Sequence, residues 1–433
     1  MKVSVIGLGR LGLPMACFYA SKGHEVVGID VNEKILNLIN DGKCPINETG
    51  LDRLMKQVDI TATANYETML GSEIIFILVA TPSDEDDKFD NKYVVNVVDT
   101  ICEVYKDKSE KPLIVLTSTV MPGSCAEVFK PKLDLVFEDT DLCYNPEFVA
   151  LGDVLKGMAN PDSILIGESS KKAGDRLVEF YSSLLFEKEP PICRMNLWNA
   201  ELAKLSLNVA LTMKITYANT IADLCEEIPQ GNVDVVTNFV GLDSRIGNKY
   251  LKGGMASGGV CLPRDVRAMV AFGEGYDLDL LIQRDMDLVN STRAIHIGNR
   301  IEEILDGIEE PIISIFGLTF KPNTPEVIES TSIALAQYLS ELYKVKVYDP
   351  MGLYGAIKYL DNKVEYHDTP HQCVKNTDLC IIATAWEEFK RLYPNWYKKL
   401  MRTPNVYDCW RIYDKKNFDE QRVNYYAVGL SNH

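Results

Sequence analysis

The sequence predicts an α/β protein made of two parallel-sheet domains joined by a long central helix. Short apolar runs rich in β-branched residues alternate with helical segments over residues 2–167 and again from residue 311 onward, which is typical of parallel sheets. Residues 197–227 contain no glycine or proline and repeat apolar residues at helical spacing, which predicts one helix of about 30 residues. The length of 433 residues also exceeds what one ordinary core accommodates.

A glycine-rich loop directly follows the first expected strand, residues 2–6. Three glycines in the spacing G-x-G-x-x-G form this loop, namely Gly7, Gly9 and Gly12. A helix is expected over residues 13–21, and a second strand over 25–29 ends at Asp30, where a carboxylate can bind a ribose hydroxyl. The pattern predicts a Rossmann domain that binds a dinucleotide. Asp30 favours NAD over NADP because a carboxylate repels a 2′-phosphate.

Polar side chains follow later strands of this first sheet. The runs 74–80 and 113–117 end close to Thr81 and Thr119, and a further stretch contains Glu147. Ligands of parallel sheets bind beyond the carboxyl ends of the strands, so these side chains are candidates to line a site. Each of them taken singly also fits ordinary turn and cap chemistry.

A second glycine-rich stretch precedes a cysteine. The eight residues before Cys261 include four glycines, and Asp265 follows four residues after it. Glycine lets a backbone approach a ligand closely, so this loop is suited to presenting the thiol to a substrate. A flexible turn with a buried cysteine is the alternative, because free cysteine is often buried.

The long helix carries three polar residues on one face. Glu201, Lys204 and Asn208 lie at i, i+3 and i+7. Lys204 and Asn208 together would offer an ammonium and an amide donor to a developing alkoxide. A solvated stripe of an amphipathic helix is the alternative interpretation.

Composition limits the classes of function. A net charge of −17 disfavours nucleic-acid and anionic-membrane partners, and no apolar run approaches the roughly 18–20 residues that a membrane span needs. The five histidines do not show metal-ligand spacing on a plausible helix, so no metal is expected. Eleven cysteines without CxxC spacing, in a chain that opens directly into a strand, favour a cytoplasmic location.

Seven motifs in order make the chain resemble the UDP-glucose/GDP-mannose 6-dehydrogenases, which are NAD-dependent nucleotide-sugar dehydrogenases that form uronic acids. The motifs are Gly7-Leu8-Gly9-x-x-Gly12-Leu13-Pro14, Ser118-Thr119-Val120-x-Pro122-Gly123, Asn145-Pro146-Glu147-Phe148, Asn160-Pro161-Asp162, Ala200-Glu201-Leu202-x-Lys204-x-x-x-Asn208, Gly258-Gly259-Val260-Cys261-Leu262-Pro263-Arg264-Asp265 and Phe316-Gly317-Leu318-Thr319-Phe320-Lys321. They span essentially the whole chain.

The resemblance implies a four-electron oxidation of a nucleotide-sugar 6-hydroxyl through a cysteine thiohemiacetal and thioester. It implies that Cys261 is the nucleophile with Asp265 beside it, that Lys204 and Asn208 bind the oxyanion, and that Glu147 is a base acting with water. UDP-glucose is the first choice of substrate, and GDP-mannose or a UDP-N-acetylhexosamine are the alternatives.

The resemblance also implies the binding residues. The expected catalytic group is Cys261, Lys204, Asn208, Asp265, Glu147 and Thr119. The expected NAD-binding group is Gly7, Gly9, Arg10, Leu11, Gly12, Asp30, Lys34, Thr81 and Thr119. The expected substrate-binding group is Glu147, Lys204, Asn208, Arg245, Tyr250, Lys252, Gly258, Lys321 and Arg411. In the family the arginine at the position of Arg245 can reach the neighbouring subunit, so a homodimer is expected.

The last third of the chain predicts a second Rossmann-like domain. A strand over residues 311–317 precedes a polar loop and a helix over 331–342, and the loop carries Lys321 in place of three spaced glycines. A lysine there suits a UDP-sugar more than a dinucleotide. We expect three domains, which are an NAD-binding Rossmann domain at 1–195, a central helical and dimerisation domain with the cysteine loop at 196–298, and a UDP-sugar-binding Rossmann-like domain at 299–433.

One departure from the family pattern concerns hydrolysis. Leu151 stands where the family commonly has a second glutamate, so the chain would use Asp265, Glu147 or water instead. Two rival classes stay open. One is a hydroxyacid or 6-phosphogluconate-type dehydrogenase, which would need no cysteine, and the other is a non-catalytic relative that binds sugar nucleotides or NAD.

Overall fold

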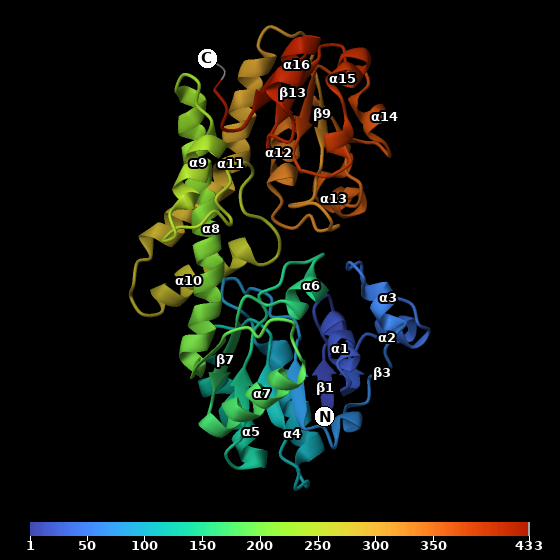
Figure 1. Ribbon diagram of the computed structural model, residues 1–433, viewed down its shortest axis with the longest axis vertical. Helices are drawn as coiled ribbons and strands as arrows, with labels where there is room; N and C mark the ends of the chain where they lie inside the picture. Colours follow the sequence, from blue (N-terminus) through green and yellow to red (C-terminus); the bar gives the residue numbers. More distant parts are fainter. Residues whose placement is uncertain (432–433) are drawn as a thin grey trace. The chain divides into compact units, whose positions relative to one another are not determined.

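The structure is a computed structural model that describes residues 1–431 and contains two compact units, Met1–Ser206 and Leu207 onward. Each unit contains a sheet with helices packed on it (Figure 1), so the predicted α/β fold with two sheet domains is confirmed. The unit boundary falls inside one long helix, and the expected three-domain division stays a prediction. Within the described residues, every helix is too short or too polar to cross a membrane.

The first unit contains an eight-stranded sheet in the order β3-β2-β1-β4-β5-β6-β7-β8. Its strands are β1 (Lys2–Ile6), β2 (Glu25–Ile29), β3 (Ile60–Thr63), β4 (Ile74–Ile77), β5 (Leu113–Leu116), β6 (Leu142–Tyr144), β7 (Ile164–Glu168) and β8 (Ile192–Asn196). The first six follow the order 3-2-1-4-5-6 of a doubly wound dinucleotide-binding sheet. The strand β7 pairs with β6 antiparallel, so the sheet is parallel except at this pair.

Helices connect these strands. They are α1 (Gly12–Ser21), α2 (Glu33–Asn40), α3 (Leu51–Met55), α4 (Lys92–Tyr105), α5 (Lys130–Phe137), α6 (Val154–Ala159) and α7 (Lys171–Ser183), with the short helices η1 (Tyr66–Met69) and η2 (Ser124–Phe129). The helix α8 (Leu197–Glu227) then leaves the first unit and enters the second. It has the bounds that the sequence predicts, because no helix-breaking residue interrupts it.

The second unit contains a six-stranded, fully parallel sheet in the order β11-β10-β9-β12-β13-β14. Its strands are β9 (Ile312–Phe316), β10 (Lys344–Tyr348), β11 (Glu365–Tyr366), β12 (Leu379–Ile382), β13 (Asn405–Asp408) and β14 (Asn424–Ala427). Its helices are α9 (Val233–Leu242), α10 (Leu262–Glu274), α11 (Leu281–Leu305), α12 (Thr331–Ser340), α13 (Leu353–Leu360), α14 (Pro370–Val374), α15 (Pro394–Leu400) and α16 (Lys415–Gln421), with η3 (Asp361–Lys363) and η4 (Phe389–Arg391). This strand order repeats that of the first sheet.

Aromatic packing fixes helices on the first sheet. The ring of Phe76 on β4 lies 5.2 Å from that of Tyr19 on α1 and 5.3 Å from that of Phe180 on α7. The rings of Tyr19 and Phe180 meet edge to face at 4.9 Å, a geometry that aromatic quadrupoles favour. This contact holds α1 against the sheet, so the glycine loop before α1 has a rigid base.

Candidate active site

The three glycines after β1 meet different surroundings. A Cβ on Gly7 would lie 2.3 Å from the Leu78 carbonyl oxygen, and one on Gly12 would lie 1.8 Å from the Gly7 carbonyl oxygen. A Cβ on Gly9 would have no protein atom within 4 Å. The protein itself therefore requires Gly7 and Gly12, whereas the open space at Gly9 is available to a ligand that approaches the backbone.

The start of α1 is suited to a pyrophosphate. Gly9 and Arg10 are exposed there, and Leu11 occupies the N-cap position without a side-chain cap hydrogen bond. The first backbone N–H groups of a helix lack intrahelical partners and carry the positive end of the helix dipole. An anion is stabilised at such a position.

Asp30 lies at the end of β2, beside this loop. Its Oδ2 accepts a hydrogen bond of 2.7 Å from the backbone N–H of Leu8, and its Oδ1 accepts one of 2.8 Å from that of Asn32. Asn32 caps α2 and accepts from the N–H of Lys34 at 3.1 Å. Asp30 is only partly buried, so its fixed carboxylate is available to the two hydroxyls of a ribose. Together with the backbone N–H groups at the start of α1, this carboxylate fits NAD.

Two threonines join the loops that follow β4 and β5. The Thr81 hydroxyl donates a hydrogen bond of 2.6 Å to the carbonyl oxygen of Thr119. Thr81 is buried and Thr119 is partly exposed. The bond joins the loops that follow β4 and β5, so Thr119 is held at the carboxyl edge of the sheet.

The polar face of α8 is buried. The exposed fraction is 0% for Glu201, 7% for Lys204 and 8% for Asn208, so the alternative of a solvated stripe is wrong. The Lys204 Nζ donates to the backbone carbonyl oxygen of Glu147 at 2.6 Å and lies 4.5 Å from the centre of the Phe148 ring. A buried charged group is stable where it has partners, and Lys204 finds them in the segment of Glu147 and Phe148.

Glu147 follows β6 and has an unusual carboxyl group. Burial raises the pKa of this carboxyl to about 7, and the nearby Lys204 ammonium lowers the pKa less than burial raises it. A carboxyl that titrates near neutral pH can accept and return a proton under working conditions. Leu151, four residues later, packs against the apolar core of the first unit.

Cys261 in the second unit is exposed, so the alternative of a buried cysteine is wrong. It is the N-cap residue of α10, and the backbone N–H of Asp265 donates to its carbonyl oxygen at 2.9 Å. Asp265 is 1% exposed. Its Oδ2 accepts a hydrogen bond of 2.6 Å from the Asn208 Nδ2, and the Arg264 guanidinium lies 3.2 Å from its Oδ1.

The glycines before Cys261 are required by the protein itself. A Cβ on Gly258 would lie 2.6 Å from the Glu329 carbonyl oxygen, and one on Gly259 would lie 2.9 Å from the Phe320 ring. The Gly259 N–H donates to the Ile328 carbonyl oxygen at 3.1 Å. The space beside Gly9 is open, whereas the space beside Gly258 and Gly259 is filled by protein.

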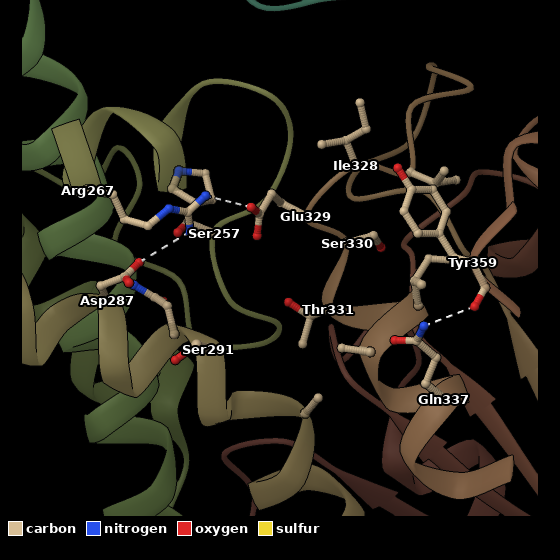
Figure 2. Close-up of a pocket in the computed structure, with 16 residues that line it drawn as sticks. Ser257, Arg267, Asp287, Ser291, Ile328, Glu329, Ser330, Thr331, Gln337 and Tyr359 are labelled. Atoms are coloured by element: carbon tan, nitrogen blue, oxygen red, sulfur yellow. Dashed lines mark hydrogen bonds and ion pairs between the residues drawn. The ribbon is translucent and has the colours of Figure 1, made fainter. Parts of the chain in front are cut away.

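A cavity of about 420 Å³ borders this loop within the second unit (Figure 2). It is lined by residues on either side of Cys261, namely Ser257 and Pro263, and by residues of α11 and α12. Its charged groups pair with one another, since the Arg267 guanidinium lies 2.6 Å from Glu329 and 3.7 Å from Asp287. The cavity therefore lies beside the cysteine loop, and the thiol is not among its lining groups.

The acidic residue after the second strand of the second sheet is more buried than Asp30 and accepts more hydrogen bonds. Asp349 follows β10 as Asp30 follows β2, and its Oδ2 accepts from the Leu318 N–H at 2.7 Å and from the Trp386 indole N–H at 3.2 Å. Its Oδ1 accepts from two further backbone N–H groups, and Asp349 is 2% exposed. Because this carboxylate is fully engaged, the second edge lacks a ribose-binding acid of the Asp30 type.

The remaining expected substrate residues differ in their surroundings. Lys321 is partly buried, with its Nζ 6.0 Å from the centre of the Phe320 ring. Arg245 is 86% exposed at its side chain and pairs with Asp243 at 2.6 Å. Tyr250 and Lys252 are exposed.

Arg411 is held inside the second unit. Its guanidinium contacts both Asp234 oxygens, at 2.8 and 2.9 Å, and donates to the Gly253 carbonyl oxygen at 2.8 Å. The side chain is 4% exposed. In these contacts the arginine ties the start of the cysteine loop to α9.

Sequence reasoning missed Glu48. This residue lies in a polar loop, is 7% exposed and accepts backbone hydrogen bonds at 2.8 Å from Gly152 and Val154. No motif or periodicity marks it, because its partners lie more than a hundred residues away in the sequence. The described residues contain no cluster of metal-ligating side chains.

Comparison with known proteins agrees with this geometry. Models of the UDP-glucose/GDP-mannose dehydrogenase family match residues 1–185 (NAD binding domain), 198–292 (central domain) and 314–415 (UDP binding domain). A UDP-glucose 6-dehydrogenase of Rickettsia felis is 34% identical over 440 residues, which cover 99% of this chain and 96% of the relative.

Solved structures of similar proteins give the same result. The UDP-glucose dehydrogenase of Pyrobaculum islandicum has a TM-score of 0.89 and 30% identity over 99% of this chain and 98% of its own. The UDP-D-ManNAc dehydrogenase of Pyrococcus horikoshii has a TM-score of 0.85 and 26% identity over 99% of each chain.

The fold, the glycine cradle and these matches define an NAD-dependent oxidoreductase. The chain belongs to the UDP-glucose/GDP-mannose dehydrogenase family, which confirms the resemblance seen in its motifs.

The middle and last glycines of the loop after β1, Gly9 and Gly12, should respond differently to a methyl group. Gly12→Ala is expected to lower the thermal midpoint sharply, because its Cβ would meet a backbone oxygen at 1.8 Å. Gly9→Ala is expected to unfold like the wild type and to lose about tenfold or more in NAD affinity, because the methyl occupies the pyrophosphate approach. Thermal unfolding without ligand and a fluorescence titration with NAD measure the two effects. Wild-type NAD affinity in Gly9→Ala would contradict this assignment.

Proposed function

We propose that the protein oxidises the 6-hydroxyl of UDP-glucose to the carboxylate of UDP-glucuronate, with two NAD molecules used in turn. Membership of the family and the exposed Cys261 at the start of α10 carry this proposal. An exposed thiol allows an aldehyde to be captured and oxidised further, whereas a simple dehydrogenase releases it. The names of the similar proteins from Rickettsia felis and Pyrobaculum islandicum support UDP-glucose as the sugar nucleotide.

The first unit holds the cofactor in this proposal. The N–H groups at the start of α1 take the pyrophosphate, Gly9 gives it room, and Asp30 takes the ribose hydroxyls. Arg10, Leu11, Lys34, Thr81 and Thr119 complete the expected NAD contacts. When bound, NAD accepts one hydride in each of the two oxidations.

The first oxidation converts the C6 alcohol to an aldehyde. C6 loses a hydride and the hydroxyl loses a proton, which Glu147 receives directly or through water, because its carboxyl titrates near 7. The Lys204 ammonium stabilises the negative charge that develops on the oxygen. Its position is set by the bond to the Glu147 carbonyl oxygen.

The second oxidation takes place on a covalent adduct. The Cys261 thiolate attacks the aldehyde carbon, and the resulting oxyanion is stabilised by Lys204 and Asn208. Loss of a second hydride from C6 then gives a thioester. Cys261 is the N-cap residue of α10, so the positive end of this helix dipole lies at the cysteine.

Hydrolysis completes the reaction. Water adds to the thioester carbon, the thiolate leaves, and the products are the carboxylate and the regenerated Cys261. Leu151 offers no proton acceptor, so Glu147 is the base that we assign to this step. Asp265 is committed to Asn208 and Arg264, and its role is to orient the amide of Asn208.

The second unit takes the UDP part of the substrate. The family match over residues 314–415 is a UDP binding domain, and the engagement of Asp349 removes the acid that a dinucleotide ribose would need. Lys321 supplies positive charge for the diphosphate, with Tyr250, Lys252 and Gly258 as further contacts. The buried Arg411 acts by holding Gly253 in place.

We infer a homodimer from an apolar surface in the second unit. On α9, Val235, Phe239 and Leu242 share a face and are 66%, 77% and 82% exposed. Exposed apolar surface of this kind indicates an interaction site, and the family resemblance implies that Arg245 reaches the site of a neighbouring subunit. Sedimentation of wild type and Phe239→Asp tests this, and a monomeric wild type would contradict it.

The stoichiometry of NADH formation tests the proposed function. With limiting UDP-glucose and excess NAD, two NADH per sugar are expected, because the alcohol loses four electrons on the way to the acid. The absorbance of NADH measures this, and GDP-mannose and UDP-N-acetylhexosamines serve as comparison substrates. One NADH per sugar would contradict covalent capture, and preferential oxidation of another sugar nucleotide would overturn the choice of UDP-glucose.

The pH dependence of kcat/KM should report Glu147. Its pKa is raised to about 7, so the carboxyl is protonated and inactive as a base below that pH, and the rate is expected to rise as pH increases through about 7. The charged and titratable groups that face it are Lys204, Tyr19 and Tyr181. The pKa values of both tyrosines are raised above their ordinary value, so they do not titrate in this range. Glu147→Gln should abolish this rise of kcat/KM with pH and lower kcat about a hundredfold or more. An unchanged pH profile in this variant would exclude Glu147 as the base.

A further inference from the structure

Two buried glutamates of the first unit accept backbone hydrogen bonds from loops at the carboxyl edge of its sheet. Glu201 on α8 is 0% exposed. Its Oε2 accepts a hydrogen bond of 2.6 Å from the Gly123 N–H, and its Oε1 accepts one of 2.8 Å from the Cys125 N–H. Both oxygens are thus engaged with the end of the loop that carries Thr119.

Glu48 uses the same geometry on a second loop. Its Oε2 accepts from the Gly152 N–H and its Oε1 from the Val154 N–H, both at 2.8 Å. The segment between β6 and α6 that ends in these N–H groups carries Glu147. Each glutamate therefore holds the backbone at the end of a segment that carries one of these residues, Thr119 or Glu147.

The helix α8 connects these two loops. Glu201 binds the loop of Thr119, and Lys204, one turn further along α8, binds the carbonyl oxygen of Glu147 at 2.6 Å. The Thr119 loop is also tied to the preceding loop by the 2.6 Å bond from Thr81. The relative positions of Thr119, Glu147 and Lys204 thus depend on a short list of hydrogen bonds.

Burying a carboxylate in the protein interior costs desolvation free energy. Burial raises the pKa of Glu201, and the backbone N–H groups of Cys125 and Gly123 oppose this by stabilising the anion. A buried ion contributes little net stability compared with a well-packed apolar side chain, but its charged hydrogen bonds are short and directional. Geometric precision, rather than stability, is what these residues supply.

We propose that Glu48 and Glu201 are positioning residues for the dehydrogenation, which hold Glu147, Thr119 and Lys204 in their reactive arrangement. This inference rests on the proposed function. Neither glutamate touches the reacting atoms. Each acts through the backbone that it holds.

Glutamine variants test the proposal with a matched control. Glu201→Gln and Glu48→Gln keep the size of the side chain, but each replaces one acceptor by an amide that cannot accept the backbone N–H. Asp141→Asn is the control, because Asp141 is a buried carboxylate of the same sheet that pairs with Arg176 at 2.9 Å at the opposite end of β6.

The expected result separates positioning from folding. Both glutamine variants should lose about tenfold or more in kcat, since small displacements of reacting groups are costly. In Glu48→Gln, whose loop carries none of the proposed NAD contacts, KM for NAD should stay within about twofold. Asp141→Asn should show a comparable fall in thermal midpoint with kcat within about twofold of the wild type. Glu201→Asp, which keeps the charge, should recover part of the activity of Glu201→Gln.

The pH profile adds an independent measurement. In Glu48→Gln the loosened segment admits water to Glu147, so the acidic limb should move from about 7 toward the ordinary value of a glutamate. NADH formation by the wild type tests the proposed function, and the ratio of variant to wild type tests this inference. Wild-type kcat in the folded glutamine variants, or equal kcat losses in Asp141→Asn, would overturn it.

Discussion

One hydrogen bond recurs in both sheets and sets what each edge can bind. In the first unit the carboxylate at the end of the second strand, Asp30, accepts from the loop after the first strand at 2.7 Å. In the second unit Asp349 accepts from the corresponding loop at the same distance. The bond fixes the first loop of a doubly wound sheet against its neighbour, and everything bound at that edge depends on it.

The carboxylates of Asp30 and Asp349 differ in their other contacts and in their burial. Asp30 stays partly exposed beside the open space at Gly9, whereas Asp349 is buried under Trp386 and further backbone donors. The same fold therefore places a partly exposed carboxylate, which suits a ribose, in one unit and a buried, fully hydrogen-bonded carboxylate in the other. This difference gives a physical reason why a NAD binding domain matches residues 1–185 and a UDP binding domain matches residues 314–415.

Much of this arrangement could be predicted from the sequence, because it depends on local patterns. The strand and helix periods, the spacing of Gly7 to Asp30 and the unbroken run of α8 are all short-range signals. The antiparallel direction of β7 could not be predicted, since a buried apolar strand has the same composition in either direction. Glu48 also escaped notice, because its hydrogen bonds join segments that are 104 and 106 residues apart. The burial of Arg411 against Asp234 depends on a pairing across 177 residues.

Covalent capture of the aldehyde by Cys261 can be measured as the mass of the trapped enzyme. Glu147→Gln lacks the base that we assign to the first oxidation and to hydrolysis. A thioester should therefore accumulate when this variant is mixed with NAD and the 6-aldehyde of UDP-glucose, which bypasses the first oxidation, and is then quenched in acid. We expect the mass of the UDP-glucuronyl group to appear on the peptide that contains Cys261. An adduct on another cysteine, or acid formation at the wild-type rate by Cys261→Ser, would contradict it.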